Sequence, residues 1–443
     1  MAEVAAFAEV RLWGRTVGGV AELDDGQIVF EYDAGFRRSG LEISPIHLPL
    51  STRGPVRFDE LLRKEGFRGL PGVLADALPD AFGKTVIRAY YTSRGELTKA
   101  FSPVQHLLYV GVRAIGALEF HPPEAVIRRV AEAEALRVSE LVADARRIMA
   151  GDVDVTIPEI YRIGSSAGGM RPKAVVLYNG SSGEVRSAFA PPQPGDVASI
   201  LKFDGVDATL EGDLGEPRPF NRVEAAYAGM ARAAGLDVVD VTMLETGDGY
   251  AHLVVPRFDH RGGEPLHQHT LGGLLHVDYN EPGASSYEEY LRTVLRLGMP
   301  PSAVVEGYRR MVFNVLAVNQ DDHVKNLSFH MDRNGVWTLT PAYDLTFAKG
   351  GGWTSTHQMR VADKRAGITH ADLTGVANAF GIRDSSGIIE RIRDVLEQWP
   401  RYAEAEGVPP DVVQRIGVEL ADRAGEVGSG RQVRRSARTP PGP

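Results

Sequence analysis

The chain has 443 residues, of which 43% are hydrophobic and 24% charged, and its formal net charge is −9 at pH 7. This composition is typical of a globular protein with a sizeable core, and the length predicts two or three domains or one bilobal unit. The lack of cysteine excludes disulfides, thiolate metal sites and cysteine nucleophiles. The chain shows neither a signal-peptide pattern nor an apolar run of membrane-spanning length, so we expect a cytoplasmic protein without a membrane partner.

The first half of the chain predicts sheets alternating with short helices. Residues 5–50 alternate apolar and polar side chains, which predicts a small antiparallel sheet with a hairpin turn at Asp24-Asp25-Gly26. Residues 67–83 and 101–120 predict short helices punctuated by turns and glycines, and His121-Pro122-Pro123 is interpreted as a boundary. Helical spacing follows over 124–150. Strands are then expected from 161 to 203, two of them joined by the turn at 179–183.

The second half is expected to be mainly helical from Asn221 onward, apart from a strand at 251–256. The helix predicted over 303–318 has one apolar face and leads directly into a polar loop. That face comprises Val304, Tyr308, Met311, Val312, Val315 and Leu316. Residues 428–443 are mostly Gly, Arg, Ser and Pro, which predicts a disordered tail.

The polar loop Asn319-Gln320-Asp321-Asp322-His323-Val324-Lys325-Asn326 is the strongest functional candidate. Asn326 follows Asp321 by five positions, and Asp344 lies beyond a stretch that predicts a hairpin. Protein kinases use such a loop Asp to orient the attacking hydroxyl, and such an Asn and a downstream Asp to hold Mg²⁺ on ATP. Their oxygens suit this hard cation. The alternative is a polar turn whose Asp and Asn serve turn geometry.

Three further segments fit a kinase, and each has a structural alternative. The glycines of 162–173 would let the backbone approach phosphates, or they form a simple turn. Lys202, on an apolar strand, would contact the α/β-phosphates of ATP, or it lies on a solvated face. Glu224 would pair with Lys202, or it completes a capping box with Asn221 at a helix start.

Two other segments have an open or a disfavoured interpretation. The apolar strand at 252–259 runs into a turn and would serve as a hinge, with backbone groups of Pro256 and Phe258 contacting adenine; a core strand would look the same. A zinc site at His267, His269 and His276 is disfavoured, because the spacing is not H-E-x-x-H and no acidic partner is suitably spaced.

Taken in order, these motifs resemble the HipA family, the serine/threonine-kinase toxins of bacterial type II toxin–antitoxin systems. The resemblance runs from Val10 to about Pro400. It is carried most sharply by the segments 69–80 (GLPGVLADALPD), 171–173 (RPK), 266–273 (LHQHTLGG), 319–326 (NQDDHVKN) and 339–344 (LTPAYD). It implies an α+β, two-lobed protein-kinase-like fold with an extra N-terminal β-rich subdomain and a mainly helical C-terminal lobe. The implied boundaries are 1–122 for that subdomain, 123–258 for the rest of the N-lobe, 259–427 for the C-lobe and 428–443 for the tail.

The resemblance also implies roles for individual residues. Asp321 would be the catalytic Asp, and Asn326 and Asp344 would bind Mg²⁺. The implied ATP-binding residues are Lys202, Glu224, Ser165, Ser166, Ala167, Gly168, Gly169, Pro256, Phe258, Asp259, His323 and Lys325. A glycine-loop serine of this family becomes autophosphorylated and inactivates the enzyme, and it aligns with Ser166, with Ser165 as the alternative. The family often has Gln-Glu before the loop lysine, where this chain has Arg171-Pro172.

The partners implied by the resemblance are a HipB-like helix-turn-helix antitoxin, operator DNA through that complex, and a protein substrate. The family precedent for the substrate is an aminoacyl-tRNA synthetase. The tail arginines Arg431, Arg434, Arg435 and Arg438 would contact DNA phosphates or remain solvated. Two other functions stay open: an ATP-binding partner of an antitoxin that acts mainly in operon repression, and a kinase for a small molecule or lipid.

Overall fold

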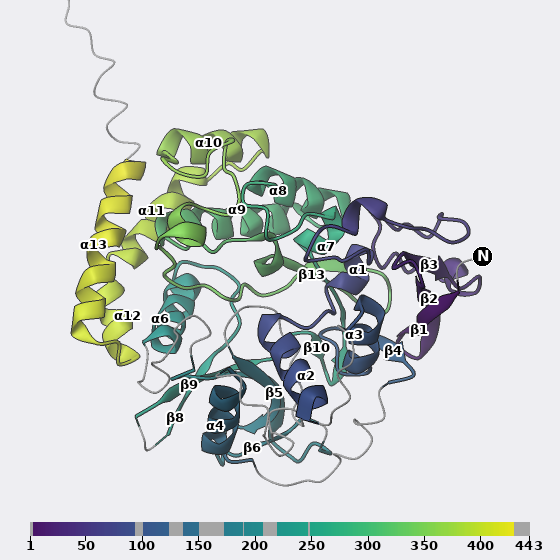
Figure 1. Ribbon diagram of the computed structural model, residues 1–443. Coiled ribbons are helices and arrows are strands. Elements are labelled where there is room, and N and C mark those ends of the chain that lie inside the picture. The colour runs from purple at the N-terminus through teal and green to yellow at the C-terminus, as the bar shows by residue number, and fades with distance from the viewer. Residues whose placement is uncertain are drawn as a thin grey trace, which may run out of the picture. The chain divides into compact units, whose positions relative to one another are not determined.

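The computed structural model describes residues 3–93, 101–123, 136–149, 172–188, 190–206, 219–246 and 249–428. The chain divides into two compact units, each made of segments distant in the sequence (Figure 1). The first comprises residues 1–221, 240–280 and 328–340, and the second comprises 222–239, 281–327 and 341–443.

The N-terminal sheet of the first unit is antiparallel, with the strand order β3-β2-β1-β4. Its strands are β1 (Val4–Leu12), β2 (Arg15–Leu23), β3 (Ile28–Tyr32) and β4 (Leu118–His121). The turn expected at 24–26 joins β2 to β3. Helix α3 (Pro103–Val110) packs on β1, and its N-terminus is closed by a capping box between Ser102 and Gln105. The alternation of the sequence thus places Val10, Leu12, Val20 and Phe30 in the core.

A five-stranded antiparallel sheet with the order β6-β5-β7-β9-β8 follows in the same unit. Its strands are β5 (Lys173–Asn179), β6 (Val185–Ser187), β7 (Asp196–Lys202), β8 (Thr242–Glu245) and β9 (Ala251–Pro256). The expected turn at 179–183 joins β5 to β6. Helix α2 (Ala81–Ser93) packs against α4 (Val138–Met149), which forms the later part of the helix expected over 124–150. Residues 124–135 and 150–171 lie outside the described chain.

Residues 242–270 contain more strands than the single one expected at 251–256. Besides β9, this region forms β8, the short pair β10 (His260–Arg261) and β11 (Glu264–Pro265), and β12 (His267–Thr270). Strand β12 pairs with β13 (Ser328–Met331), which forms the expected hairpin with β14 (Trp337–Leu339). Sequence periodicity missed β12 because its buried side chains are the histidines His267 and His269 rather than apolar residues.

Two glycine-containing motifs, far apart in the sequence, meet in the first unit. Helix α1 (Gly72–Ala75) packs on α7 (Leu271–Leu275), and a Cβ on Gly72 would overlap the carbonyl group of Gly273. Asp76 fixes the contact, since its carboxylate accepts hydrogen bonds from Thr270 N (2.8 Å) and the Thr270 hydroxyl (2.7 Å). These glycines are therefore required by a close backbone approach.

In the part of the second unit that the structure describes, the regular elements are all helical. Its α-helices are α6 (Phe220–Ala233), which begins at the end of the first unit, α8 (Tyr287–Arg296), α9 (Pro301–Leu316), α10 (His370–Ala379), α11 (Ser385–Leu396), α12 (Trp399–Ala405) and α13 (Pro410–Val427). Helix α9 contacts α8, α11 and α13 (Figure 1). The six apolar residues predicted to share one face of α9 are all buried, which confirms that helix and its orientation.

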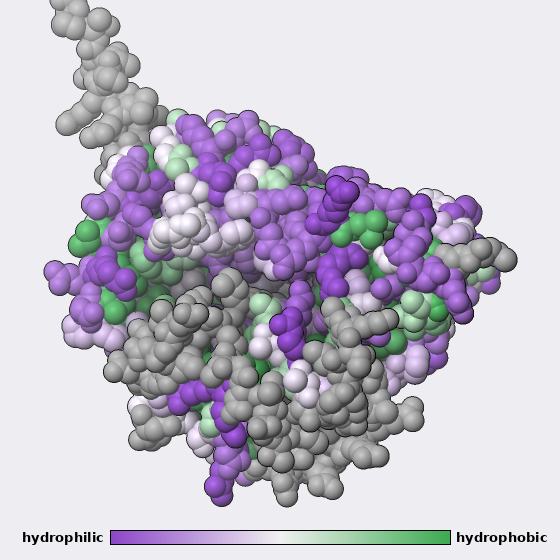
Figure 2. Space-filling view, in the orientation of Figure 1, coloured by the Kyte–Doolittle hydropathy of each residue, from purple (hydrophilic) through white to green (hydrophobic). Residues whose placement is uncertain are grey.

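The exposed apolar residues of the described chain are distributed rather than gathered. Figure 2 shows hydrophobic residues interspersed with hydrophilic ones on one face. Large exposed examples, such as Phe7, Val112 and Val418, belong to different elements. Isolated residues of this kind are normal on protein surfaces and do not define a docking site. In the described ranges, the helices are too short or too polar to cross a bilayer.

Candidate active site

Helix α9 delivers the chain into the polar loop at a fixed point. The helix ends at Leu316, and Val318 has a left-handed φ of 54°. The next two residues are anchored by their backbones, because Asn319 N donates to Asn314 O (3.0 Å) and Gln320 N donates to Ala348 O (2.9 Å). The residues that follow are thus held on a rigid scaffold, which is what a catalytic constellation needs.

The two adjacent carboxylates of the loop have different environments. Asp322 is buried and accepts three hydrogen bonds, from the Tyr287 hydroxyl (2.9 Å), His357 Nδ1 (3.0 Å) and Gln358 N (2.7 Å). The side chain of Asp321 is 43% exposed, and its Oδ1 accepts a hydrogen bond from Trp353 Nε1 (2.7 Å). Asp322 therefore holds the loop in place, while Asp321 is the one accessible to a substrate.

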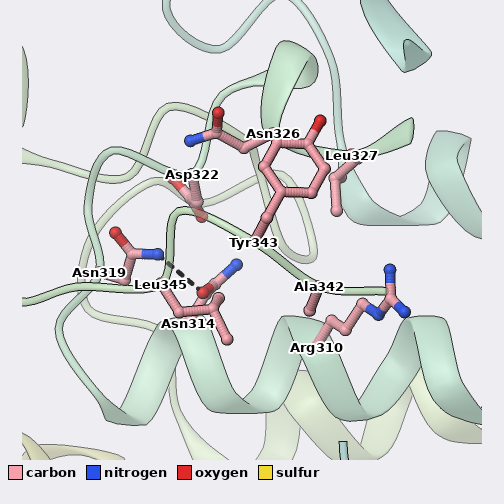
Figure 3. Close-up of a pocket in the computed structure, with 9 residues that line it drawn as sticks. All are labelled: Arg310, Asn314, Asn319, Asp322, Asn326, Leu327, Ala342, Tyr343 and Leu345. Carbon is pink, nitrogen blue, oxygen red and sulfur yellow. Dashed lines mark hydrogen bonds between the residues drawn. The ribbon is translucent and has the colours of Figure 1, made fainter. Parts of the chain in front are cut away.

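A chain of buried polar groups continues from Asp322 into α9. Tyr287 accepts a hydrogen bond from Asn314 Nδ2 (2.9 Å), and Asn314 Oδ1 accepts one from Asn319 Nδ2 (2.9 Å), the dashed bond in Figure 3. Burial, together with the charge of Asp322, raises the pKa of Tyr287 well above its ordinary value, so its hydroxyl remains a donor. The network ties Asn319 and Asp322 of the loop to helices α8 and α9.

The cavity in Figure 3 lies within this network and is not a nucleotide site. It is lined by Asn314, Asn319, Asp322, Asn326 and Tyr343, among others, and has a volume of about 10 Å³. Such a volume matches roughly one water molecule. The cavity is therefore too small for a phosphorylated ligand.

Asn326 and Asp344, the candidate metal ligands, are held close to this loop. The Asn326 amide nitrogen donates to Asp321 O (2.9 Å), which leaves the amide oxygen as the group that can bind a cation. Asp344 has a left-handed φ of 52°, and the preceding Tyr343 donates its hydroxyl hydrogen to Lys325 O (2.6 Å). This hydrogen bond joins the turn that contains Asn326 to the turn that contains Asp344, and each turn carries one candidate oxygen ligand for a metal ion.

The charges of Asp321 and Asp344 both act on the imidazole of His323. Burial lowers the pKa of the His323 imidazole, and the charges of Asp321 and Asp344 oppose that effect. Lys325 also contributes to the field at this ring. Among the described residues no three His, Asp or Glu side chains are grouped as metal ligands. The donor set nevertheless fits Mg²⁺, which takes one or two protein carboxylates and completes its shell with water and phosphate oxygens.

Lys202 lies in the first unit at the end of β7, and it is not on a solvated face as the structural alternative supposed. It is 8% exposed and is the cross-strand partner of Lys173, which is 4% exposed. Lys173 Nζ lies 3.7 Å from Asp80 Oδ2. The other carboxylate oxygen of Asp80, Oδ1, accepts a hydrogen bond from Gly83 N (2.6 Å). Two lysines are thus buried at paired positions of β5 and β7, and one of them lies beside a carboxylate.

The helix-cap interpretation of Asn221 is wrong. Helix α6 already begins at Phe220, and the Asn221 amide nitrogen donates to Ala251 O (3.0 Å) and Lys202 O (3.3 Å). Asn221 therefore joins the start of α6 to the end of β7 and the beginning of β9. Glu224 lies in the first turns of α6 and is buried.

The turn after β9 is rigidly held in the first unit. Arg257 N donates to Ala198 O (2.8 Å), and the Arg257 guanidinium pairs with the buried carboxylate of Asp259. Asp259 Oδ2 also accepts a hydrogen bond from Gly116 N (2.6 Å). Pro256 ends β9, and the ring of Phe258 lies 5.7 Å from that of His330. The carboxylate of Asp259 is thus engaged by protein donors.

The three histidines considered for zinc have separate structural partners. His267 Nε2 donates to Ile43 O (2.8 Å), and His276 Nε2 accepts a hydrogen bond from Gly72 N (3.1 Å). His269 lies between Asp76 Oδ2 (2.6 Å) and Ser44 Oγ (3.0 Å), an order of groups found in hydrolases. Ser44 and His269 are fully buried, so this set holds the N-terminal segment to β12 and is closed to substrates.

Several predicted residues lie outside the described chain, and several structural ones were missed. These include Ser165, Ser166, Ala167, Gly168 and Gly169, within 150–171, and the tail arginines, within 429–443. The residues missed from the sequence are Tyr287, Trp353, His357 and Gln358, which contact the catalytic loop. They lie more than 25 positions away from it, so no local spacing identifies them.

Two family models match the chain, one in its N-terminal part and one in its central and C-terminal part. Residues 165–401 match the family model described as "HipA-like C-terminal domain", and residues 8–121 match the one described as "HipA N-terminal domain". A protein of Sinorhizobium fredii named "Putative kinase Y4dM" is 24% identical over 413 residues, which cover 90% of this chain and 91% of the relative. A Haemophilus influenzae protein named "Putative kinase" is 28% identical over 135 residues, covering 28% of this chain and 39% of the relative.

One solved structure shows how the chain folds. It is a Shewanella oneidensis complex whose name gives its parts as the toxin–antitoxin system proteins HipA and HipB and their operator DNA. The likeness has a TM-score of 0.68 at 20% identity and covers 98% of this chain and all of that chain. The expected mixed α and β fold of HipA type is therefore confirmed.

Proposed function

The chain belongs to the HipA family, and from that premise we propose that it is an ATP- and Mg²⁺-dependent serine/threonine protein kinase that acts as the toxin of a type II toxin–antitoxin system. The observation that carries the proposal is the contrast between Asp321 and Asp322. The Asp322 carboxylate holds the loop, whereas the Asp321 carboxylate is exposed. The Asn326 amide is hydrogen-bonded to Asp321 O, and Asp344 follows Tyr343, whose hydroxyl is hydrogen-bonded to Lys325 O in the same loop.

In the proposed mechanism, Asp321 accepts a hydrogen bond from the substrate hydroxyl and orients its oxygen toward the γ-phosphorus. The oxygens of Asn326 and Asp344 hold Mg²⁺, and Lys202 binds the α/β-phosphates. Bound Mg-ATP supplies the phosphoryl group together with the cation that neutralises its charge. Phosphoryl transfer needs little covalent participation from the protein, so positioning and electrostatic stabilisation carry the rate.

The remaining site residues have supporting roles in this proposal. Glu224, His323 and Lys325 contribute charge or position near ATP, and the backbone at Pro256, Phe258 and Asp259 contacts adenine. The glycine loop with Ala167, Gly168 and Gly169 covers the phosphates. Ser166, or alternatively Ser165, is the self-inactivating phosphorylation site.

The proposed partners follow from the same family membership. We infer a HipB-like antitoxin and, through it, operator DNA, because the structure that aligns along the whole chain is that of a complex with such partners. The phosphorylated target is a protein in the cytoplasm.

The test is transfer of labelled phosphate from Mg-ATP, with the chain itself and a cytosolic extract as acceptors. The proposal predicts labelled serine or threonine, lost when Mg²⁺ is chelated and lost in Asp321→Asn. Asp363→Asn is the matched control, since Asp363 is 92% exposed and lies outside the loop. Label that is equally strong in Asp321→Asn and wild type would exclude the proposed role of Asp321. Label on neither acceptor would contradict the kinase proposal.

A further inference from the structure

The indole of Trp353 is hydrogen-bonded to the Asp321 carboxylate. Its N–H donates to Asp321 Oδ1 at 2.7 Å. An indole is a donor only, so this hydrogen bond occupies one carboxylate oxygen and leaves the other, Oδ2, for a second donor. Asp321 is 43% exposed, which means that burial does not fix its side chain.

The backbone of Trp353 is fastened to the catalytic loop by Gln358. The Gln358 side-chain nitrogen donates to Trp353 O (2.5 Å) and Thr356 O (3.0 Å), and it lies 3.3 Å from Gln320 O, the residue before Asp321. The Gln358 backbone N–H also donates to Asp322 (2.7 Å). The segment 353–358 is therefore attached to both neighbours of Asp321, which gives the indole a defined position.

We propose that Trp353 is a positioning residue, which orients Asp321 so that Oδ2 faces the substrate hydroxyl. This inference rests on the proposed kinase function. In the step that it serves, the hydroxyl oxygen forms a bond to the γ-phosphorus of ATP. The bond from that phosphorus to the bridging oxygen breaks, and its electron pair remains on the ADP that leaves. The hydroxyl proton passes to Asp321 Oδ2, while the indole N–H stays on Oδ1.

The opposite role for Trp353 is autoinhibition, in which the indole occupies the place of the substrate hydroxyl. Two observations favour positioning. The indole engages one oxygen and leaves the other available, and the backbone carbonyl of Trp353 is held by the Gln358 side-chain nitrogen, which also lies beside Gln320 O. A blocking residue would need to leave the site for each turnover and break these contacts with it.

The test compares Trp353→Phe with wild type. Phenylalanine retains an aromatic ring but has no N–H donor. The readout is the initial rate of phosphate incorporation into the chain, measured by intact-protein mass over a range of Mg-ATP concentrations, together with the thermal midpoint. Hydrogen bonds to charged groups are strong enough that we expect kcat to fall roughly tenfold. The KM for ATP should stay the same, because the indole contacts Asp321 and not the nucleotide, and the thermal midpoint should change little.

The matched control is Trp399→Phe, which removes an indole hydrogen bond to Val413 O (2.9 Å) elsewhere in the second unit. It should leave kcat unchanged. Gln358→Met removes the side-chain donors that hold the indole segment, and it should lower kcat by the same route. The double variant Trp353→Phe/Gln358→Met should therefore be no worse than the poorer single variant, since the two act through one contact.

The outcomes separate this inference from the proposed function. If wild type transfers phosphate and Trp353→Phe has the same kcat, the positioning role is wrong while the kinase proposal stands. A higher kcat in Trp353→Phe would replace positioning with autoinhibition. If wild type transfers no phosphate at all, the kinase proposal fails, and the inference falls with it.

Discussion

The same substitution at the neighbouring residues Asp321 and Asp322 should have opposite consequences. Asp322→Asn removes a buried charge that accepts hydrogen bonds from Tyr287, His357 and Gln358. Each hydrogen bond to a charged group contributes about 1.5–3 kcal/mol, and the new amide nitrogen would face at least one of these donors. We therefore expect the free energy of unfolding to fall by about 3 kcal/mol.

The corresponding loss in the thermal midpoint is about 6–12 °C, since 1 kcal/mol shifts Tm by roughly 2–4 °C in a unit of this size. Asp321→Asn removes an exposed charge that accepts a hydrogen bond from Trp353 and lies 4.0 Å from His323 Nε2, and it should change stability by less than about 1 kcal/mol. Thermal and urea unfolding of both variants, followed by circular dichroism, measure the difference. Equal stability of the two variants would refute the assignment of Asp322 as the residue that holds the loop.

Two further predictions concern the first unit. Gly72→Ala should lower the free energy of unfolding by about 3 kcal/mol, because its Cβ would overlap the Gly273 backbone. The control is Gly351→Ala, in the second unit, where the new Cβ meets open space. Thermal unfolding should show little change in the stability of this control. Normal stability of Gly72→Ala would disprove the close contact. Burial lowers the pKa values of His267 and His276 to about 3, so below pH 6.5 the unfolded chain binds protons that the folded chain does not. Urea unfolding should show a loss of about 1.4 kcal/mol per pH unit for each histidine between about pH 5.5 and 4.5; a level profile would contradict their neutral, buried state.

The sequence predicted the features that depend on local spacing. Alternation gave the N-terminal sheet, and the apolar face of 303–318 gave the buried helix α9. The hairpin before Asp344 follows from its turn residues, since Asp332 O accepts a hydrogen bond from Gly335 N. In each case the pattern is contained in a short run of consecutive residues, in which the helix or strand period can be recognised.

The features that the sequence could not predict depend on distant partners. Strand β12 has no apolar alternation, because its inward histidines are stabilised by Ile43 and Asp76 rather than by hydrophobic contacts. The difference between Asp321 and Asp322 comes from residues 32 to 36 positions away. Nothing in the pair itself reveals which carboxylate is buried; Asp321 was favoured by its five-residue spacing to Asn326 and by the family resemblance.

The central claim is that Asp321 makes this chain a kinase, and intact-protein mass spectrometry tests it most directly. Wild type, Asp321→Asn and Ser166→Ala, each purified and incubated with Mg-ATP, are compared with Asp363→Asn as the control. The account predicts a gain of one phosphate in wild type and the control, no gain in Asp321→Asn, and no gain in Ser166→Ala. Phosphate in Ser166→Ala but not in Asp321→Asn would mean that another residue is modified, and Ser165 would be tested next. Phosphate in Asp321→Asn at the wild-type rate would contradict the account.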